Sequence, residues 1–409
     1  MSNAEQPLGE VIQYLRGITF KPEEKVEPTA DDAVVCMRTK NVQDILDESD
    51  LIAVPSSLVR RDELYLRAGD ILLSSANSWN LVGKVCRVPQ LRYRATAGGF
   101  ISVVRPRSTV DSRYLYHWLA SPDVQERIRG CARQTTNIAN LSVPQFEQLR
   151  IRVPPLAEQR RIADILDKAD AIRRKRKEAI ALTEELLRSA FLDMFGDPVM
   201  NPKGWPTETI DDLCSRGARL VDGPFGSSLK PEHYVSAGVK VVRNWNIYDD
   251  RFDFSEFKYV TPAKFEEIRR SEVLPGDVLI TTKGTVGDVC MAPDLGGPAA
   301  LSASGTVRLR LPTDESYLPE FVVGQMTTRR YKSYLHTFEA GSAQQYLNLS
   351  AIRKMRLIRP PRKEQTVFRT FRARIRESQR QVSDAHNRTE DLFQSLVARA
   401  FSGELESSQ

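Results

Sequence analysis

The 409-residue sequence has few cysteines and histidines, and neither residue type is clustered. The five cysteines are odd in number and never form a C-x-x-C pair, which argues against a disulfide framework and against a zinc site. The four histidines are equally dispersed, so we interpret each as an ordinary surface or core residue rather than a metal ligand. The sequence therefore predicts no metal site and no structural disulfide.

Long apolar runs are also missing. No stretch approaches the roughly 20 apolar residues of a membrane-spanning helix, and the polar segment Met1–Pro7 lacks the apolar run of a secretory signal. A hydrophobic fraction of 41% and a charged fraction of 27% are typical of a globular chain, so we expect a cytoplasmic protein with no membrane partner. The net charge of +6 permits an anionic partner such as DNA but does not require one.

Motifs for covalent chemistry are absent as well. The sequence contains no G-x-x-x-x-G-K-[ST] loop, which argues against a nucleotide-hydrolysing motor. It has no Asn-Pro-Pro-aromatic or Asp-Pro-Pro-aromatic segment, and no glycine-rich strand-turn-helix that would suit a methyl donor. Gly284–Gly287 has only two glycines and is better interpreted as a hairpin loop. We therefore expect a non-catalytic chain without a cofactor.

What the sequence does contain is a long internal repeat. Gly69 of the segment Ala68–Leu73 returns as Gly276 of Pro275–Ile280, which is 207 residues later. Two further segments return after 208 and 206 residues: Asn140–Ser142 as Asn348–Ser350, and Pro154–Gln159 as Pro360–Gln365. A repeat of this length is not a solenoid, whose units span about 20–50 residues. It indicates two copies of one large module, and 409 residues are enough for each copy to bury its own core.

Each half has the same predicted order of elements: short strands, a helix, a Pro-Pro pair and then a long polar helix. In the first half we expect strands at 70–73, 84–88, 100–104 and 149–153 and a helix over 112–129. In the second half we expect strands at 277–281, 288–291 and 306–311 and a helix near 318–334. Because strands and helices do not alternate in a βαβαβ rhythm, the pattern favours the α+β class over a doubly wound sheet.

After each Pro-Pro pair the apolar residues recur in steps of three and four. In the first long helix the predicted seam has apolar or small residues at 162, 165, 169, 172, 179, 186 and 190; in the second it has them at 368, 371, 375, 382, 385, 392 and 396. Such a seam is typical of a coiled coil, and each helix would be about 60 Å long. We expect the two helices to pair in antiparallel fashion, so that they separate the two modules. Alternatively, each seam packs onto its own module.

These patterns divide the chain into four segments. Residues 1–155 and 198–361 form the two modules, and 156–197 and 362–409 are the central and the C-terminal helix. Within the central helix, the basic run Arg173–Lys177 has three possible roles: a solvated helix face, a contact to phosphates, or a docking site for an acidic partner.

The order of these motifs resembles the specificity subunit of type I restriction-modification systems. The resemblance rests on the duplicated Gly-Asp-Ile/Val-Leu strand, the Asn-Leu-Ser turn and the Pro-Pro-x-x-Glu-Gln helix start. Three further segments carry it: Phe195–Pro198, Asn201–Trp205 and Asp222–Ser227. It covers nearly the whole chain.

The resemblance implies two target-recognition domains that each read one half of a split double-stranded DNA sequence, held apart by two antiparallel helices. It also implies partners: two modification subunits that methylate adenine, and restriction subunits that translocate and cleave DNA at the expense of ATP.

Polar side chains gather in three clusters of each half, and side chains of these types read base edges and hold phosphates. The strand-end clusters are Arg38–Asn41 and Arg243–Asn246, the hairpin clusters follow the Gly-Asp strands, and the third clusters precede the Asn-Leu-Ser turns. The expected DNA-binding residues of the first half are Arg38, Lys40, Asn41, Ser75, Asn77, Ser78, Asn80, Lys84, Gln134, Thr135 and Asn137. Those of the second half are Ser227, Ser228, Lys230, Arg243, Asn244, Trp245, Asn246, Lys283, Thr285, Gln344, Gln345 and Tyr346. Alternatively, these clusters are solvated loops whose Asn and Ser side chains cap turns.

Apolar residues outside the predicted seam are candidates for partner contact, or for packing onto a recognition domain: Leu187, Phe191, Leu192, Phe393 and Val397. Two other functional classes remain open. The chain could be a free-standing enzyme that modifies or cleaves DNA, or a protein-interaction scaffold without any DNA role.

Overall fold

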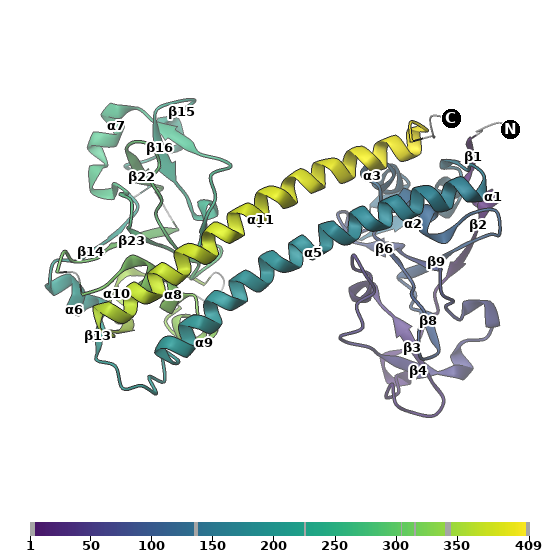
Figure 1. Ribbon diagram of the computed structural model, residues 1–409, viewed down its shortest axis with the longest axis horizontal. Coiled ribbons are helices and arrows are strands. Elements are labelled where there is room, and N and C mark those ends of the chain that lie inside the picture. The colour runs from purple at the N-terminus through teal and green to yellow at the C-terminus, as the bar shows by residue number, and fades with distance from the viewer. Residues whose placement is uncertain are drawn as a thin grey trace. The chain divides into compact units, whose positions relative to one another are not determined.

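The structure is a computed structural model that describes residues 5–134, 138–224, 226–303, 305–314, 316–339 and 345–405 (Figure 1). Its contacts divide the chain into two compact units, residues 1–177 with 384–409, and residues 178–383. Each unit combines one module with one half of each of two long helices, α5 (Leu156–Phe195) and α11 (Arg362–Ser402). The mixture of short strands and helices in both modules confirms the predicted α+β class.

The module of the first unit is built on an antiparallel four-stranded sheet in the order β2-β9-β5-β7. A second sheet, β4-β3-β8, pairs β3 antiparallel with β4 and parallel with β8, and β1 pairs with β12. The elements are β1 (Glu5–Pro7), α1 (Leu8–Val11), β2 (Ile12–Arg16), β3 (Ala33–Met37), β4 (Ala53–Pro55), β5 (Ile71–Ser74), β6 (Ala76–Asn77), β7 (Val85–Arg87), β8 (Ala95–Ala97), β9 (Ile101–Pro106), α2 (Ser112–Ala120), α3 (Pro122–Gly130), β10 (Ala132–Gln134), β11 (Ala139–Leu141), α4 (Val143–Glu147) and β12 (Arg150–Arg152).

The module of the second unit repeats the two main sheets of the first, and β13 pairs with β24 as β1 does with β12. Its four-stranded sheet has the order β14-β23-β20-β21, and β16 again pairs antiparallel with one neighbour, β19, and parallel with the other, β22. The elements are β13 (Thr207–Thr209), α6 (Ile210–Ser215), β14 (Arg219–Asp222), β15 (Tyr234–Val235), β16 (Val239–Val242), β17 (Ile247–Tyr248), β18 (Arg251–Phe252), β19 (Lys258–Val260), α7 (Pro262–Glu267), β20 (Val278–Thr281), β21 (Val289–Met291), β22 (Ala299–Leu301), β23 (Thr306–Arg310), α8 (Pro319–Met326), α9 (Arg329–His336), α10 (Leu349–Arg353) and β24 (Arg356–Ile358).

The repeated Gly-Asp pair has the same structural role in both modules. Gly69 and Gly276 have φ angles of 92° and 88°, a left-handed conformation that favours glycine. The next residue is buried and binds an arginine of the neighbouring strand: Asp70 accepts hydrogen bonds from Arg105 at 2.7 Å, and Asp277 from Arg310 at 2.8 and 2.9 Å. A turn and a buried ion pair therefore explain why this segment occurs twice.

The predicted strands are confirmed to within a few residues, but the prediction of one helix over 112–129 is wrong. The chain forms α2 and α3 there, because the helix ends at Ser121 before Pro122, and proline disfavours helical geometry in the preceding residue. The second half breaks at the corresponding point, where the Thr328 side chain caps α9.

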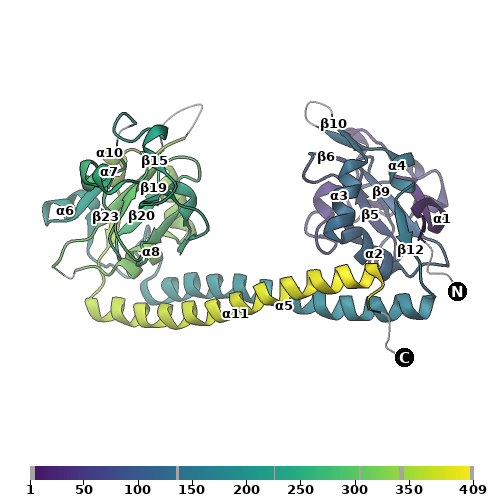
Figure 2. The ribbon, with the colours of Figure 1, turned by 90° about the horizontal axis from the view of Figure 1, so that it is seen from above.

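The two long helices are antiparallel, as predicted. In the first unit Arg173 of α5 lies 3.6 Å from Glu390 of α11. In the second unit, Glu184 of α5 lies 3.4 Å from Gln379 of α11, so residues later in α5 meet residues earlier in α11 (Figure 2).

The predicted seam is confirmed only in part. Its positions Ile162 and Phe368 are buried, at 4% and 1% exposed. Its positions Ile172, Leu186 and Leu392 are 49%, 46% and 59% exposed, and the residues that follow Leu186 and Leu392 pack inwards instead.

The two long helices also contain buried polar side chains, among them Asp170 and Gln379. The predicted seam was based on the spacing of apolar residues, and buried polar residues do not contribute to that spacing. The prediction therefore favoured the neighbouring face of the helix at these positions.

Candidate nucleic-acid interface

The strand-end cluster of the first module lies where β3 ends, in the turn Thr39–Asn41. Asn41 is completely buried: its side-chain oxygen accepts a hydrogen bond from the Arg38 backbone N–H at 2.8 Å, and its side-chain nitrogen donates to the Asp47 and Asp50 carbonyls. Arg38 and Lys40 both form ion pairs with Asp50. Asn41 therefore shapes the loop that presents Arg38 and Lys40.

The strand-end cluster of the second module has the same construction after β16. Asn246 is also completely buried, accepts from the Arg243 backbone N–H at 2.9 Å and donates to the carbonyls of Asp253 and Glu256. The Arg243 guanidinium lies over the Trp245 ring, 3.2 Å from its centroid, and Trp245 is 43% exposed. The expectation that Asn41 and Asn246 bind DNA does not fit their burial; these two residues order the loops around them.

Strand pairing brings the hairpin cluster and the third cluster of the first module together. The short strand β6 carries Asn77 and pairs with β11, so that Asn77 lies opposite Ala139. On its other edge β11 pairs with β10, where Gln134 also lies opposite Ala139. Asn77 and Gln134 thus flank one strand, and β6 and β10 lie on the side of the module away from α5 (Figure 2).

Side-chain contacts connect the strand-end cluster of the first module to its hairpin cluster. Lys84 donates a hydrogen bond to the Gln43 side chain at 2.5 Å, and Gln43 donates to the Lys40 carbonyl at 2.8 Å. Phe100, which is 60% exposed, accepts hydrogen bonds at its carbonyl from the backbone N–H groups of Ser75 and Ala76. Phe100 and Arg38 line one cavity of about 460 Å³. Sequence reasoning missed Phe100, because an aromatic residue at the start of a strand usually packs in a core.

The three clusters of the second module also converge. The backbone N–H of Leu347, next to Tyr346, donates to the carbonyl of Thr282 at 3.0 Å, and Thr282 precedes Lys283 of the hairpin cluster. At Gly284 and Gly305 an added methyl group would meet Asn244 at 3.1 and 3.8 Å, so the strand-end cluster lies against the hairpin. Residues about 100 sequence positions apart therefore form one polar surface in each module.

Apart from Asn41 and Asn246, all expected DNA-binding residues that the structure describes have accessible side chains. Those that are exposed are Lys40, Ser78, Asn80, Gln134, Ser227, Ser228, Lys230, Trp245, Lys283, Thr285, Gln345 and Tyr346. Those that are half-buried are Arg38, Ser75, Asn77, Lys84, Arg243 and Asn244. Thr135, Asn137 and Gln344 lie outside the described residues.

Most of the candidates for partner contact belong to the core of their own unit. Leu187, Phe191 and Val397 are at most 5% exposed, and the Phe191 ring packs against Phe368 with a centroid distance of 5.4 Å. Phe393 is half-buried and packs against the core of the first unit. These four side chains follow the alternative prediction, that they pack onto a recognition domain, and only Leu192 is exposed, at 43%.

The basic run of α5 is mostly paired within its own unit. Arg173 and Arg174 bind Asp170 at 2.8 and 2.9 Å, and Arg176 donates to the Ala385 carbonyl and the Thr389 hydroxyl. Lys177 lies 3.4 Å from Asp44. These contacts join α5 to α11 and to the first module.

The described residues contain no group of three or more His, Cys, Asp or Glu side chains that could hold a metal ion. All five cysteines are free thiols, and burial raises the pKa of Cys36 and Cys86 to about 12. Among the helices of the described ranges, none is long and apolar enough to cross a membrane.

Comparisons with known proteins agree with this arrangement. A family model described as the type I restriction modification DNA specificity domain matches residues 3–182. The specificity subunit of the type I restriction enzyme EcoKI from Escherichia coli K12 is 26% identical over 416 residues, which cover 98% of this chain and 88% of that relative. Residues 3–182 thus match a type I restriction-modification DNA specificity domain, and nearly the whole chain is similar to type I restriction specificity subunits.

Other specificity subunits extend the match over both modules. The StySPI specificity subunit of Salmonella potsdam is 24% identical, with 98% of this chain and 89% of that relative covered. Among solved structures, the type I restriction-modification S subunit from M. genitalium matches with a TM-score of 0.54 at 15% identity, over 97% and 96% of the two chains. A chain from a study of the assembly and conformational transition of a type I restriction-modification system matches with a TM-score of 0.50 at 16% identity, over 97% of both chains. These two likenesses show the shared fold.

Proposed function

We propose that this chain is a specificity subunit that reads a bipartite DNA sequence for a type I restriction-modification complex, one half-site with each module. The observation that carries the proposal is the convergence of three polar clusters, far apart in sequence, on one surface of each module. The scaffold beneath the two surfaces is the same, including the buried Asn41 and Asn246, while the exposed side chains differ. Two different half-sites require this combination of a shared frame and different reading residues.

Arginine, glutamine and asparagine side chains of these surfaces match the donor and acceptor pattern of base edges in the major groove. In the first module we assign this role to Arg38, Asn77 and Gln134, and in the second to Arg243, Asn244 and Gln345. Lysines and small hydroxyl residues hold the phosphates on either side: Lys40, Ser75, Ser78, Lys84, Ser227, Ser228, Lys230, Lys283 and Thr285. Trp245 and Tyr346 add apolar contact area.

The long helices set the length of the unread spacer between the two half-sites. Each is about 40 residues long, or about 60 Å at 1.5 Å per residue, and neither contains an internal break. In this proposal residues 1–155 and 198–361 are the two recognition domains. Residues 156–197 and 362–409 set the distance between these domains and bind the partner subunits.

The two long helices also bind the partner subunits. Leu186 of α5 and Leu392 of α11 are related by the repeat, 206 residues apart, and both are exposed, by 46% and 59%. A single exposed leucine is ordinary, but the same exposed position on both helices provides two similar docking points. They suit two modification subunits, which bring the methyl-transfer chemistry; restriction subunits bring ATP-driven translocation and cleavage.

The direct test is binding of DNA by the subunit alone and by its complex with a modification subunit of the same organism. We expect sequence-dependent binding of duplex DNA by the assembled complex that weakens steeply with salt, because phosphate contacts release counterions. We expect no methylation and no cleavage by the subunit alone. A subunit that methylates or cuts DNA without partners, or a complex with no salt-sensitive DNA binding, contradicts the proposal.

A further inference from the structure

In the second module, the strand-end cluster continues directly into a hairpin that reaches both long helices. The strands β17 and β18 pair Ile247 with Phe252 and Tyr248 with Arg251, and Asp249 and Asp250 form the turn between them. Asp250 has a φ angle of 57°, an unusual conformation for a residue other than glycine, and its backbone N–H donates to the Val289 carbonyl at 2.7 Å. The turn therefore has a fixed geometry only three residues after Asn246.

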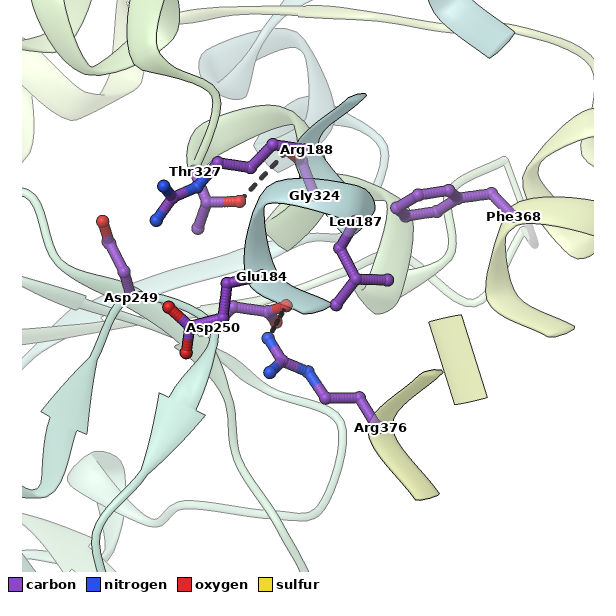
Figure 3. Close-up of a pocket in the computed structure, with 9 residues that line it drawn as sticks. All are labelled: Glu184, Leu187, Arg188, Asp249, Asp250, Gly324, Thr327, Phe368 and Arg376. Atoms are coloured by element: carbon purple, nitrogen blue, oxygen red, sulfur yellow. Dashed lines mark hydrogen bonds and ion pairs between the residues drawn. The ribbon is translucent and has the colours of Figure 1, made fainter. Parts of the chain in front are cut away.

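Two arginines of α11 bind the Asp250 carboxylate. Arg372 donates to Oδ1 through a terminal nitrogen and to Oδ2 through Nε at 3.4 Å. Arg376 donates to Oδ2 through a terminal nitrogen (Figure 3). The three side chains are largely shielded from water, with exposures of 13% for Asp250, 10% for Arg372 and 15% for Arg376. Charge-assisted pairs of this kind are stronger than exposed ones, and removing one partner leaves a poorly solvated charge.

Neighbouring contacts attach the same hairpin to further elements. Arg251 lies 3.3 Å from Glu184 of α5, and Glu184 in turn lies 3.4 Å from Gln379 of α11. Asp249 forms an ion pair with Lys332 of α9. The turn is thus bound by residues of three helices, and Asp250 lies at its tip, next to a small cavity of about 20 Å³ that Glu184 and Arg376 also line (Figure 3).

Among the residues that the structure describes, the first module has no matching attachment. At the corresponding place after its strand-end cluster, Asp44 contacts α5 through Lys177, at 3.4 Å, and both side chains are more than half exposed. Such a surface pair contributes little. The residues of α5 that match Arg372 and Arg376 at the 206-residue offset are Leu166 and Asp170, neither of which can bind a carboxylate as an arginine does.

We propose that Asp250 is a positioning residue for base reading by the second module. Through Arg372 and Arg376 it fixes the strand-end cluster, Arg243–Asn246, relative to α11, so that this cluster meets its half-site in one defined orientation. The first module reads without such a fixed connection. This inference rests on the proposed DNA-reading function.

The test compares Asp250→Asn with Asp44→Asn in the complex with the modification subunit. Asparagine tolerates the left-handed backbone of Asp250, so the substitution removes the charge and preserves the turn. Methylation is measured on the wild-type site and on duplexes with single base-pair changes in either half-site. For Asp250→Asn we expect discrimination within the second half-site to fall about tenfold, as for the loss of one good base contact. Discrimination within the first half-site, and the maximal rate on the wild-type site, should stay unchanged.

Asp44→Asn should leave discrimination in both half-sites unchanged. Arg376→Gln removes the same ion pair from the other side and should lower discrimination within the second half-site as Asp250→Asn does. It keeps the test possible if the Asp250→Asn protein does not fold. Unchanged discrimination in both variants, or an equal loss in both half-sites together with a lower melting temperature, overturns the positioning role. If the wild-type complex itself shows no sequence preference, it is the proposed function that fails.

Discussion

The side-chain oxygen of Gln159 accepts a hydrogen bond from the backbone N–H of Asp111 at 2.8 Å, and this contact fastens the start of α5 to the start of α2. The Gln159 side chain also donates to the carbonyls of Pro154 and Thr109. Gln365, 206 residues later, repeats the arrangement with Leu318, Pro360 and Ser316. Both glutamines are completely buried, so each module is joined to its long helix by the same bonded side chain.

Replacing Gln159 by leucine should destabilise the first unit by roughly 3 kcal/mol, because one N–H and two carbonyls lose their partner in the interior. The free energy of unfolding from urea titration measures this, and Gln365→Leu should act similarly on the second unit. Gln381→Ala is the matched control: Gln381 is an exposed glutamine of α11, and its substitution should change stability by less than about 0.5 kcal/mol. If all three substitutions changed the free energy of unfolding equally, Gln159 and Gln365 would not be what joins each module to its long helix.

Arg243→Ala should relax the sequence preference at one or two base pairs of one half-site, with a cost of about 1–3 kcal/mol. Binding to duplexes that differ by single base pairs measures this. Lys230→Ala provides the comparison, because an exposed lysine that holds a phosphate should weaken binding to all sequences and reduce the salt dependence. Uniform weakening by Arg243→Ala would identify Arg243 as a phosphate contact instead.

Removing one heptad from each long helix should shorten the spacer and leave both half-sites unchanged. Residues 175–181 and 381–387 are suitable, because Arg176 contacts Ala385 and the two segments lie opposite each other. Seven residues correspond to about 10 Å of helix, which is at most about three base pairs of DNA. Repeating the same heptads should lengthen the spacer by the same amount. Altered half-site sequences with an unchanged spacer length would show that the helices do not set the spacer length.

Leu186→Asp and Leu392→Asp should each remove one of two modification subunits, and the double variant should bind none. Native mass spectrometry of the purified complex counts the bound copies directly. Leu274→Asp is the control, because Leu274 is 41% exposed in a loop outside the long helices. A wild-type complex that contains a single modification subunit would disprove the claim that each copy of the repeat provides one docking point.

Local sequence signals predicted much of this fold. The Gly-Asp turns, the short strands and the ends of the long helices depend on neighbouring residues, and Gly69 and Gly276 have the conformation that this interpretation requires. The phase of the helix seam depends instead on polar side chains that are buried with bonding partners. Asp170 is buried with ion pairs to Arg173 and Arg174 of the same helix. Gln379 is buried with hydrogen bonds to Arg376 and to Glu184 of the other helix, and no count of apolar residues can recognise such positions.

The candidate interface was predicted by residue type but not by geometry. Arg38 and Asn41 are three positions apart in one cluster, yet Arg38 has an accessible side chain and Asn41 is completely buried. The convergence of the clusters depends on pairings such as that of β6 with β11, between segments about 60 residues apart. The role of Asp250 depends on Arg372 and Arg376, more than 120 residues further along the chain.

The most direct test of the central claim is a genome-wide map of methylated adenines in the source organism, with and without this gene. The account predicts that deletion abolishes methylation at one split motif, which reveals both half-sites and the spacer together. Co-expression with a modification subunit of the same organism, in a host without such a system, should restore methylation at that motif. An unchanged map combined with no motif in the second host would contradict the assignment of this chain as the subunit that selects the DNA sequence.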